Sequence, residues 1–185
     1  MTRFGYVMVT YFAAMGVAIA SFIPTPTKLI WNATASAPIG FYTVEPGDRI
    51  EVPELVAVMP PKPLADFMVG RGYVGRGVPL LKRVLGLPGQ RVCRVRSTIT
   101  VDGVEMGKAL QRDRIGRELP IWQGCRVIGD GEIFLMNWEV QDSLDGRYFG
   151  PIPASSVIGR ALPLWTDEEG DGRYEWRAHT QWPAL

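Results

Sequence analysis

The sequence predicts a mostly β protein, with a single antiparallel, barrel-like domain behind one N-terminal transmembrane helix. Residues 6–23 carry no charge, and short runs rich in β-branched and apolar residues follow them. Pro-Gly, Asp-Gly and Gly-Asp turns separate these runs, which is typical of antiparallel strands. The 185 residues leave room for one compact domain of about 150 residues behind the apolar segment, but not for two.

The N-terminal run from Tyr6 to Ile23 is 18 residues long, close to the length of about 18–20 apolar residues that can span a membrane. Pro24 and Pro26 end it. A cleavable signal peptide is the alternative, because Arg3 supplies a basic start and residues 18–20 (Ala-Ile-Ala) form a small-x-small site. We favour a retained anchor because the apolar run continues past that site.

The charges beside the anchor predict its orientation. Arg3 and the amino terminus lie on one side, and Lys28 lies close on the other. The positive-inside rule then places the N-terminus in the cytoplasm and the remaining chain outside the bacterial inner membrane, facing the periplasm. The expected segments are a cytoplasmic N-terminus (1–5), the anchor (6–23), a periplasmic β domain (24–165) and a polar C-terminal tail (166–185).

Six segments after the anchor have strand character, and one has helix formers. The predicted strands lie within residues 41–52, 55–61, 77–95, 97–106, 125–137 and 154–165. The segment 62–73, KPLADFMVGRGY, predicts a short helix. The tail is polar and rich in glycine, so we expect a loosely held terminus.

Composition excludes two classes of function. Twenty basic residues balance 19 acidic ones for a net charge of +1, and no basic stripe is present, so we expect no nucleic-acid partner. One histidine and two cysteines cannot make an ordinary four-ligand zinc site without carboxylates at a recognisable spacing. We therefore expect neither a metal nor a cofactor.

The stretch ASAPIGFY (35–42) presents Ser36 just before a turn that contains proline and glycine. A serine that only starts the turn is the default interpretation. A nucleophilic serine needs a base, and the single histidine, His179, lies in the tail. No G-x-S-x-G motif surrounds Ser36 either.

Lysine is the remaining base, and Lys82 lies in the apolar run PLLKRVLGLPG. Burial among such neighbours disfavours the ammonium form and lowers the pKa of a lysine, which can then accept a proton near neutral pH. From this stretch alone, a surface lysine whose stem packs along a strand is the more common outcome.

Three segments together resemble a known family. SAPIGFY, then LLKRVLGLPGQ, whose lysine lies 46 positions after Ser36, then NWEVQDSLDGRYFGPIP resemble, in order, the nucleophile, lysine and Ser-x-Asp-x-Arg boxes of the type I signal peptidases. The similarity covers residues 6–165, and the segment from Val101 to Asn137 resembles the conjugative-transfer branch of that family. The resemblance implies a signal-peptidase-type catalytic domain with a Ser-Lys dyad.

The resemblance also implies a role for each matching residue. Ser36 matches the nucleophile and Lys82 the general base. Thr34 matches a hydroxyl that helps to bind the oxyanion, and Ser143 one that orients the lysine amine. Asp145 and Arg147 match an ion pair under the site. Plain structural roles remain open for these four, because the two hydroxyls can satisfy turn backbone and Asp145-Gly146 is typical of a hairpin turn.

The chain departs from the family in three respects. Ser-Ala-Pro-Ile replaces the usual Ser-Met-x-Pro, and Leu-Met-Asn (135–137) stands where Gly-Asp-Asn is common. The second β domain of many leader peptidases does not fit in this length. These differences favour a dedicated substrate over a general housekeeping role.

The resemblance implies a membrane-anchored serine endopeptidase that cuts after small residues. Its expected partners are a peptide or pilin precursor, the inner membrane and other conjugation or pilus components. In the conjugative branch, the pilin ends are joined into a circle, so the pilin's own amino terminus is an alternative to water as the attacking group. Apolar residues such as Pro38, Ile39 and Phe41 would help to exclude water.

Two other classes share some of these features. A self-cleaving or repressor-type Ser-Lys peptidase has the dyad but no use for residues 6–23. A non-catalytic, membrane-anchored β module of a secretion or pilus assembly has the anchor and the strands but no need of Lys82. Cys93 and Cys125 either form a disulfide in an oxidising compartment or remain two buried thiols, and the sequence leaves both open.

Overall fold

The computed structural model describes residues 2–22, 28–47 and 49–178. Its first element is α1 (Arg3–Ser21), a helix where the sequence predicts the apolar span. Thr2 caps this helix, because its side-chain oxygen accepts a hydrogen bond from the Gly5 N–H at 3.4 Å. No residue of α1 is buried, and the helix is long and apolar enough to cross a membrane.

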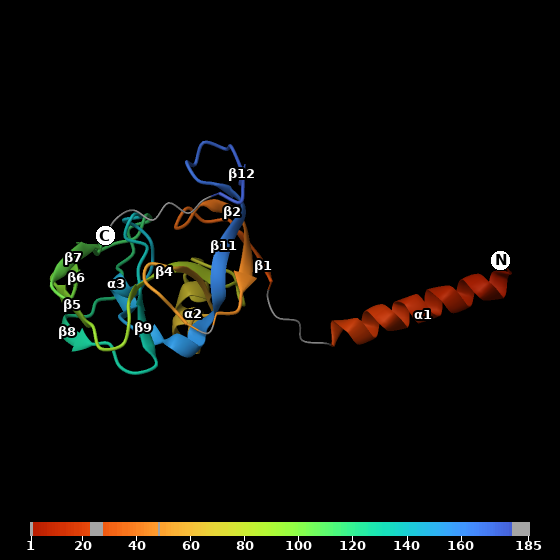
Figure 1. Ribbon diagram of the computed structural model, residues 1–185, viewed down its shortest axis with the longest axis horizontal. Coiled ribbons are helices and arrows are strands. Elements are labelled where there is room, and N and C mark those ends of the chain that lie inside the picture. The colour runs from red at the N-terminus through yellow and green to blue at the C-terminus, as the bar shows by residue number, and fades with distance from the viewer. Residues whose placement is uncertain (1, 23–27, 48, 179–185) are drawn as a thin grey trace.

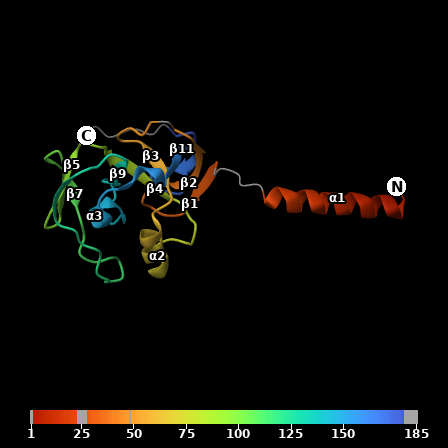
Figure 2. The ribbon, with the colours of Figure 1, turned by 90° about the horizontal axis from the view of Figure 1, so that it is seen from below.

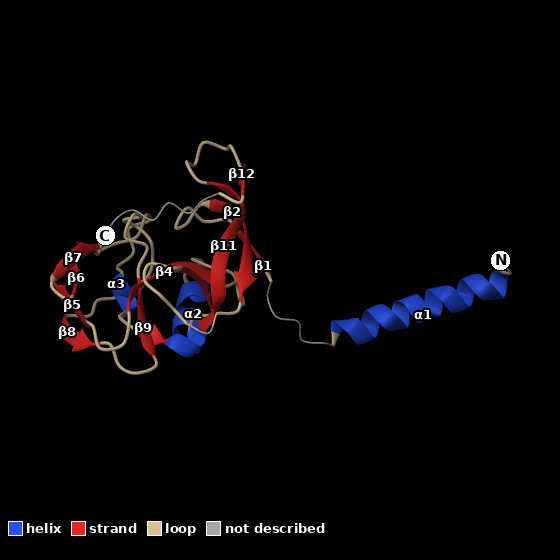
Figure 3. Cartoon of the chain, viewed as in Figure 1, coloured by secondary structure: helices blue, strands red, loops and turns tan. Residues whose placement is uncertain are grey.

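Behind α1 the described chain consists mostly of antiparallel strands, which confirms the predicted fold class (Figure 3). The larger sheet contains, in spatial order, β1 (Leu29–Asn32), β2 (Ile39–Glu45), β11 (Val157–Asp167), β3 (Leu55–Val58), β4 (Leu80–Gly86), β9 (Glu132–Leu135) and β10 (Ile152–Pro153), and β12 (Glu175–Trp176) pairs with β11. The smaller sheet contains β7 (Val104–Lys108), β6 (Thr98–Val101), β5 (Arg91–Val95) and β8 (Gly124–Val127).

The described strands do not close into a barrel, although the sequence predicts a barrel-like domain. In the larger sheet, the end strands β1 and β10 each pair with a single neighbour, β2 and β9. Closure requires the first and last strands to pair along their length. Strand β10 is only two residues long and contains Pro153, which has no N–H to donate, so it ends the sheet.

Strand β11 is longer than the sequence predicts. It continues through Thr166 and Asp167, both buried, and β12 returns from the C-terminal segment so that Trp176 pairs with Trp165. Gly40 of β2 allows this extension, because a Cβ at that position would lie 2.2 Å from the Trp165 carbonyl oxygen. Residues 166–167 and 175–176 therefore belong to the sheet, so the described part of the tail is not only a loose terminus.

Two α-helices and one 3-10 turn complete the domain: α2 (Lys62–Gly70), α3 (Gly146–Phe149) and a 3-10 helix at Ala154–Ser156. Helix α2 confirms the short helix predicted within 62–73. In the view of Figure 2 it lies below β3 and β4. Separate clusters of buried apolar residues lie within the larger sheet and between β9 and the smaller sheet.

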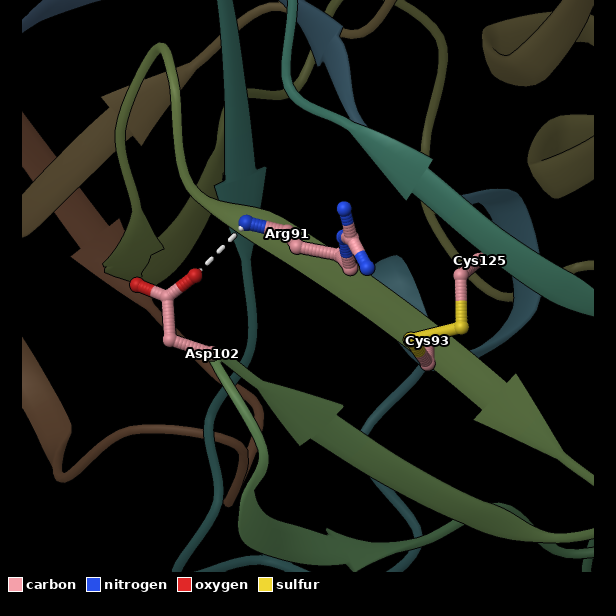
Figure 4. Close-up of a disulfide and its surroundings, with 4 residues drawn as sticks. All are labelled: Arg91, Cys93, Asp102 and Cys125. Atoms are coloured by element: carbon pink, nitrogen blue, oxygen red, sulfur yellow. Dashed lines mark hydrogen bonds between the residues drawn. A yellow bond between two sulfur atoms is a disulfide. The ribbon is translucent and has the colours of Figure 1, made fainter.

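The two cysteines form a disulfide between neighbouring strands of the smaller sheet (Figure 4). Cys93 of β5 and Cys125 of β8 are direct register partners. On the other side of β5, the Asp102 carboxylate accepts a hydrogen bond from the Arg91 N–H at 2.8 Å. Of the two alternatives that the sequence leaves open, the structure therefore contains the disulfide.

Candidate active site

The turn between β1 and β2, the first two strands of the larger sheet (Figure 1), contains Ser36. Its hydroxyl oxygen is 3.1 Å from that of Thr34, within hydrogen-bonding distance. The next residue, Ala37, is buried and packs with Tyr42 and Leu81. Ser36 thus lies on a turn that is attached to the hydrophobic core through the buried Ala37.

Asn32 holds this turn in shape, a role that the sequence analysis missed. It is 8% exposed, and its side-chain amide nitrogen contacts the carbonyl oxygens of Thr34, Ala37 and Pro38 at 2.8–3.0 Å. Its side-chain oxygen accepts from the N–H and the hydroxyl of Thr34, at 3.2 and 2.9 Å. The hydroxyl of buried Tyr42 also donates to the Pro38 carbonyl, at 2.7 Å. The backbone on both sides of Ser36 is therefore fixed.

Lys82 lies in the middle of β4, where it pairs with Val56 of β3. The side chain is buried, because β4 is covered on both faces and only 5% of Lys82 is exposed. Its ammonium nitrogen donates a hydrogen bond to the Ser143 hydroxyl at 2.7 Å. The surface-lysine alternative is thus wrong.

Burial lowers the pKa of Lys82 from 10.5 to about 8. The Asp145 carboxylate opposes this shift and the Arg147 guanidinium adds to it. With a pKa near 8, about a tenth of the Lys82 side chains are neutral at pH 7, against about three in ten thousand for an ordinary lysine. Lys82 can therefore act as a base near neutral pH.

The segment 137–147 forms the floor beneath Lys82. The side chains of Asp145 and Arg147 are at most 1% exposed and form a two-pronged ion pair, with nitrogen–oxygen distances of 2.9 and 2.8 Å. Arg147 also donates to the carbonyl oxygens of Val140, Gln141 and Ser143 at 2.7–3.2 Å. The guanidinium thus shapes the loop that carries Ser143.

Gly146 permits this floor to approach β9. A Cβ there would lie 2.6 Å from the Leu135 carbonyl oxygen and 2.6 Å from the Phe134 ring. The Asp145 side chain caps the short helix α3 by accepting from the Arg147 N–H at 3.1 Å. Asp145-Gly146 therefore begins a short helix and does not form the hairpin turn that was the alternative interpretation of this dipeptide.

One cleft of about 1020 Å³ brings four of the six predicted site residues together. Thr34, Ser36, Lys82 and Ser143 line it, while Asp145 and Arg147 are buried and are not among its lining residues, although Arg147 donates to the Ser143 carbonyl. Segments 71–75 and 110–119 form other parts of its wall. His179 lies outside the described residues. A hydroxyl and a partly neutral amine on one cleft are the groups needed for nucleophilic catalysis of acyl transfer.

Asn137 is a second residue that the sequence analysis did not assign to the site. Its side-chain nitrogen donates to the Ser36 carbonyl, and its side-chain oxygen accepts from the Arg83 N–H at 2.8 Å. Both Asn32 and Asn137 adjoin a buried strand segment, but an asparagine at a strand end is common in turns. Only their hydrogen-bond partners distinguish these two asparagines from ordinary turn residues, and the partners of Asn137 are distant in the sequence.

Comparison with known proteins gives a consistent set of relatives. The profile of the family described as "Signal peptidase, peptidase S26" matches residues 1–165. The conjugal transfer protein TraF of Agrobacterium fabrum is 37% identical over 145 residues, which is 73% of this chain and 81% of that protein. The plasmid transfer protein TraF of Escherichia coli is 32% identical with the same coverage.

Two further matches are more distant. A probable signal peptidase I-1 of Synechocystis sp. is 31% identical over 129 residues, 65% of this chain and 63% of that protein. A solved signal peptidase I from Enterococcus faecalis shares 21% identity over 60% of this chain and 98% of its own, with a TM-score of 0.35.

Proposed function

The chain belongs to the signal peptidase family S26, and we propose that it is a membrane-anchored serine endopeptidase with Ser36 as nucleophile and Lys82 as general base. The environment of Lys82 is the observation that supports the dyad. Lys82 is buried, has a pKa near 8 and lines the same cleft as Ser36. A buried lysine has little structural benefit, because its ammonium loses hydration. A role as base explains why it is there.

In this mechanism, neutral Lys82 accepts the proton of the Ser36 hydroxyl as the oxygen attacks the scissile carbonyl carbon. The oxyanion is stabilised by the Ser36 N–H and by the Thr34 hydroxyl, which is 3.1 Å from the Ser36 oxygen and turns its single hydrogen from the Asn32 side-chain oxygen to the oxyanion. The C–N bond then breaks, and the Lys82 ammonium protonates the leaving amine. An ester joins Ser36 to the substrate, and water or another nucleophile releases it.

Ser143, Asp145 and Arg147 support the dyad in this proposal. The Ser143 hydroxyl accepts from the Lys82 amine at 2.7 Å and so aims it. The Asp145–Arg147 pair holds the loop that carries Ser143. Since Asp145 favours the ammonium form and Arg147 disfavours it, the pair has opposing effects on the Lys82 pKa while it fixes the geometry.

Helix α1 serves as the membrane anchor, with residues 1–5 in the cytoplasm and the β domain in the periplasm. Its length, its lack of charge after Arg3 and the absence of buried residues support this placement. The disulfide supports an oxidising compartment. The names of the TraF relatives favour conjugation, so we propose a peptide or pilin precursor as substrate, processed together with other conjugation components.

Two single substitutions test the dyad. Ser36→Ala and Lys82→Ala should each reduce cleavage at least about 10³-fold, and the double variant should be no worse than either, since the two residues act as one unit. The full chain in detergent is assayed with a fluorogenic peptide that has alanine one and three positions before the cut. Ser155→Ala and Lys108→Ala, which change exposed residues outside the cleft, are the matched controls.

The pH profile of kcat/KM is the second measurement. Cleavage should increase with pH through a midpoint near 8, with about a tenth of the plateau at pH 7 and about a hundredth at pH 6. A flat profile between pH 6 and 9, or substantial cleavage by Lys82→Ala, would remove lysine as the base. Conjugation that survives both dyad substitutions would favour the non-catalytic β module.

A further inference from the structure

We propose that Asn137 is a positioning residue, whose side-chain amide joins the turn that carries Ser36 to the strand that carries Lys82. This inference rests on the proposed Ser36–Lys82 dyad. Asn137 lies two residues after the end of β9, and only 3% of it is exposed. Its hydrogen-bond partners lie in the turn that carries Ser36, in the strand that carries Lys82 and in the Asp145–Arg147 ion pair.

The larger sheet does not by itself bring the two dyad residues into register. Ser36 lies between β1 and β2, Lys82 lies in β4, and strands β11 and β3 separate β2 from β4. Small errors in the three strand pairings from β2 to β4 would add up at the dyad. A direct bond between the turn and β4 avoids this, and Asn137 provides it.

The side-chain amide of Asn137 continues the ladder between β4 and β9 where the backbone of β9 leaves it. The last backbone bond of this ladder runs from the Met136 N–H to the Arg83 carbonyl, at 2.9 Å. One step further, the Asn137 side-chain oxygen accepts from the Arg83 N–H at 2.8 Å, and its nitrogen donates to the Leu81 carbonyl at 3.2 Å. The side chain thus replaces a peptide group and fixes the backbone on both sides of Lys82.

The Asn137 side-chain nitrogen donates its second hydrogen to the Ser36 carbonyl oxygen. An amide nitrogen has two donors and its oxygen can accept, so one asparagine can make all three bonds. The backbone of Asn137 is fixed as well: its N–H donates to the Asp145 carboxylate at 3.1 Å, and its carbonyl accepts from Arg147 at 3.2 Å. Asn137 therefore links the Ser36 turn, the Lys82 strand and the ion pair.

Asn137 itself is not among the described residues that line the cleft. Truncating its side chain should therefore leave substrate binding alone and change only the relation between Ser36 and Lys82. A displacement of about 1 Å can lower a rate about 10²-fold. We expect Asn137→Ala to lower kcat by about 10² while KM stays within threefold.

A second readout separates positioning from general loss of structure. Loosening the turn and β4 would admit water to Lys82 and raise its pKa from about 8 toward the ordinary value. Asp145 and Arg147 are the charged groups that shift the Lys82 pKa, and the charged residues that line the cleft with Lys82 are Arg71, Asp113, Arg114, Arg117 and Asp142. Asn137→Ala leaves all of these charges in place, so a raised midpoint would report hydration.

The experiment uses full-length protein in detergent, labelled with ¹³C at the lysine ε-carbon. The chain has four lysines, and Lys82→Arg identifies the signal of Lys82. Peptide cleavage and the titration of this signal are measured for native protein, Asn137→Ala and Gln90→Ala. Gln90 is the matched control, because its side-chain amide also bonds backbone, at Leu87, but lies outside the cleft. Gln90→Ala should match the native protein in both readouts.

A kcat within threefold of native, or an unchanged Lys82 midpoint, in folded Asn137→Ala would overturn the proposal. If Asn137→Ala fails to fold, Asn137→Asp replaces it in the kinetic test, because it keeps the size and the acceptor for Arg83 but loses the donors to Ser36 and Leu81. Its kcat should also decrease with KM preserved. Failure of the dyad itself gives a different result, in which Ser36→Ala cleaves as well as native protein.

Discussion

Replacing Lys82 by methionine is expected to stabilise the protein while abolishing cleavage. Methionine has a similar length and no charge, so it can fill the same buried space in β4. The native ammonium must be desolvated or deprotonated on folding, and this cost is reflected in its lowered pKa. Removing the amine removes that cost.

The size of the effect follows from the pKa values. The Lys82 pKa falls from 10.5 to about 8 on folding, and one pKa unit corresponds to about 1.36 kcal/mol. At pH 7, below both values, folding the native chain therefore costs about 3 kcal/mol through this group. Loss of the hydrogen bond to Ser143 offsets about 1 kcal/mol, so Lys82→Met should gain about 2 kcal/mol.

The sign of the pH dependence is fixed by the same linkage. Between pH 8 and 10.5 the unfolded chain binds more protons than the folded one, so the native protein gains stability as the pH rises. At pH 9.5 the cost is down to about 1 kcal/mol. The advantage of Lys82→Met should then be close to zero.

Urea unfolding in detergent, monitored by tryptophan fluorescence, measures the free energies of unfolding at pH 7 and 9.5. Lys108→Met is the matched control, because Lys108 is exposed on β7, and it should differ from native protein by less than about 0.5 kcal/mol. A Lys82→Met variant that is less stable than native at pH 7, or equally stabilised at both pH values, would show that Lys82 carries no burial cost.

Two further predictions concern the disulfide and the product. Cys93 and Cys125 are 32 positions apart, so the double Cys→Ser variant should lose between about 3 and 4 kcal/mol of unfolding free energy. Native material alkylated without reductant should show no modified cysteine by mass spectrometry, and two modified cysteines would reject the bridge. If a tethered amine intercepts the Ser36 ester faster than water does, the processed pilin precursor should be one water lighter than its hydrolysis product, since effective molarities of oriented groups can exceed that of water. An intact mass equal to that of the hydrolysis product, in cells with the cognate pilin and its other processing enzymes, would leave a plain protease.

The sequence predicts those features that depend on local pattern. Lys82 is conspicuous because it interrupts a continuous apolar run, and such runs form strands that are buried on both faces, as β4 is. The short helix within 62–73 and most of the strands follow from the same kind of pattern. The disulfide could not be chosen over two free thiols, because the pairing of Cys93 with Cys125 depends on β5 and β8 being neighbours.

Other features depend on contacts that sequence spacing does not reveal. Whether the sheet closes depends on β10, whose two residues give no strand pattern. The extension of β11 depends on Gly40, more than 120 residues earlier. Asn32 and Asn137 are ordinary turn residues until their partners are known, and the partner of Asn137 in the Ser36 turn is 101 positions away.

The apolar residues next to Ser36 and Lys82 explain how the cleft obtains its shape. Ala37, beside Ser36, and Leu81, beside Lys82, belong to one buried cluster, so packing brings the two polar residues to the same region. Dispersion contacts are short-ranged but weakly directional, and they tolerate shifts of a few tenths of an ångström. Rates of acyl transfer are more sensitive than that to the position of the reacting atoms. Hydrogen bonds are directional, so the amide of Asn137, bonded on both sides of Lys82 and to the Ser36 carbonyl, supplies the precision that the apolar cluster alone does not.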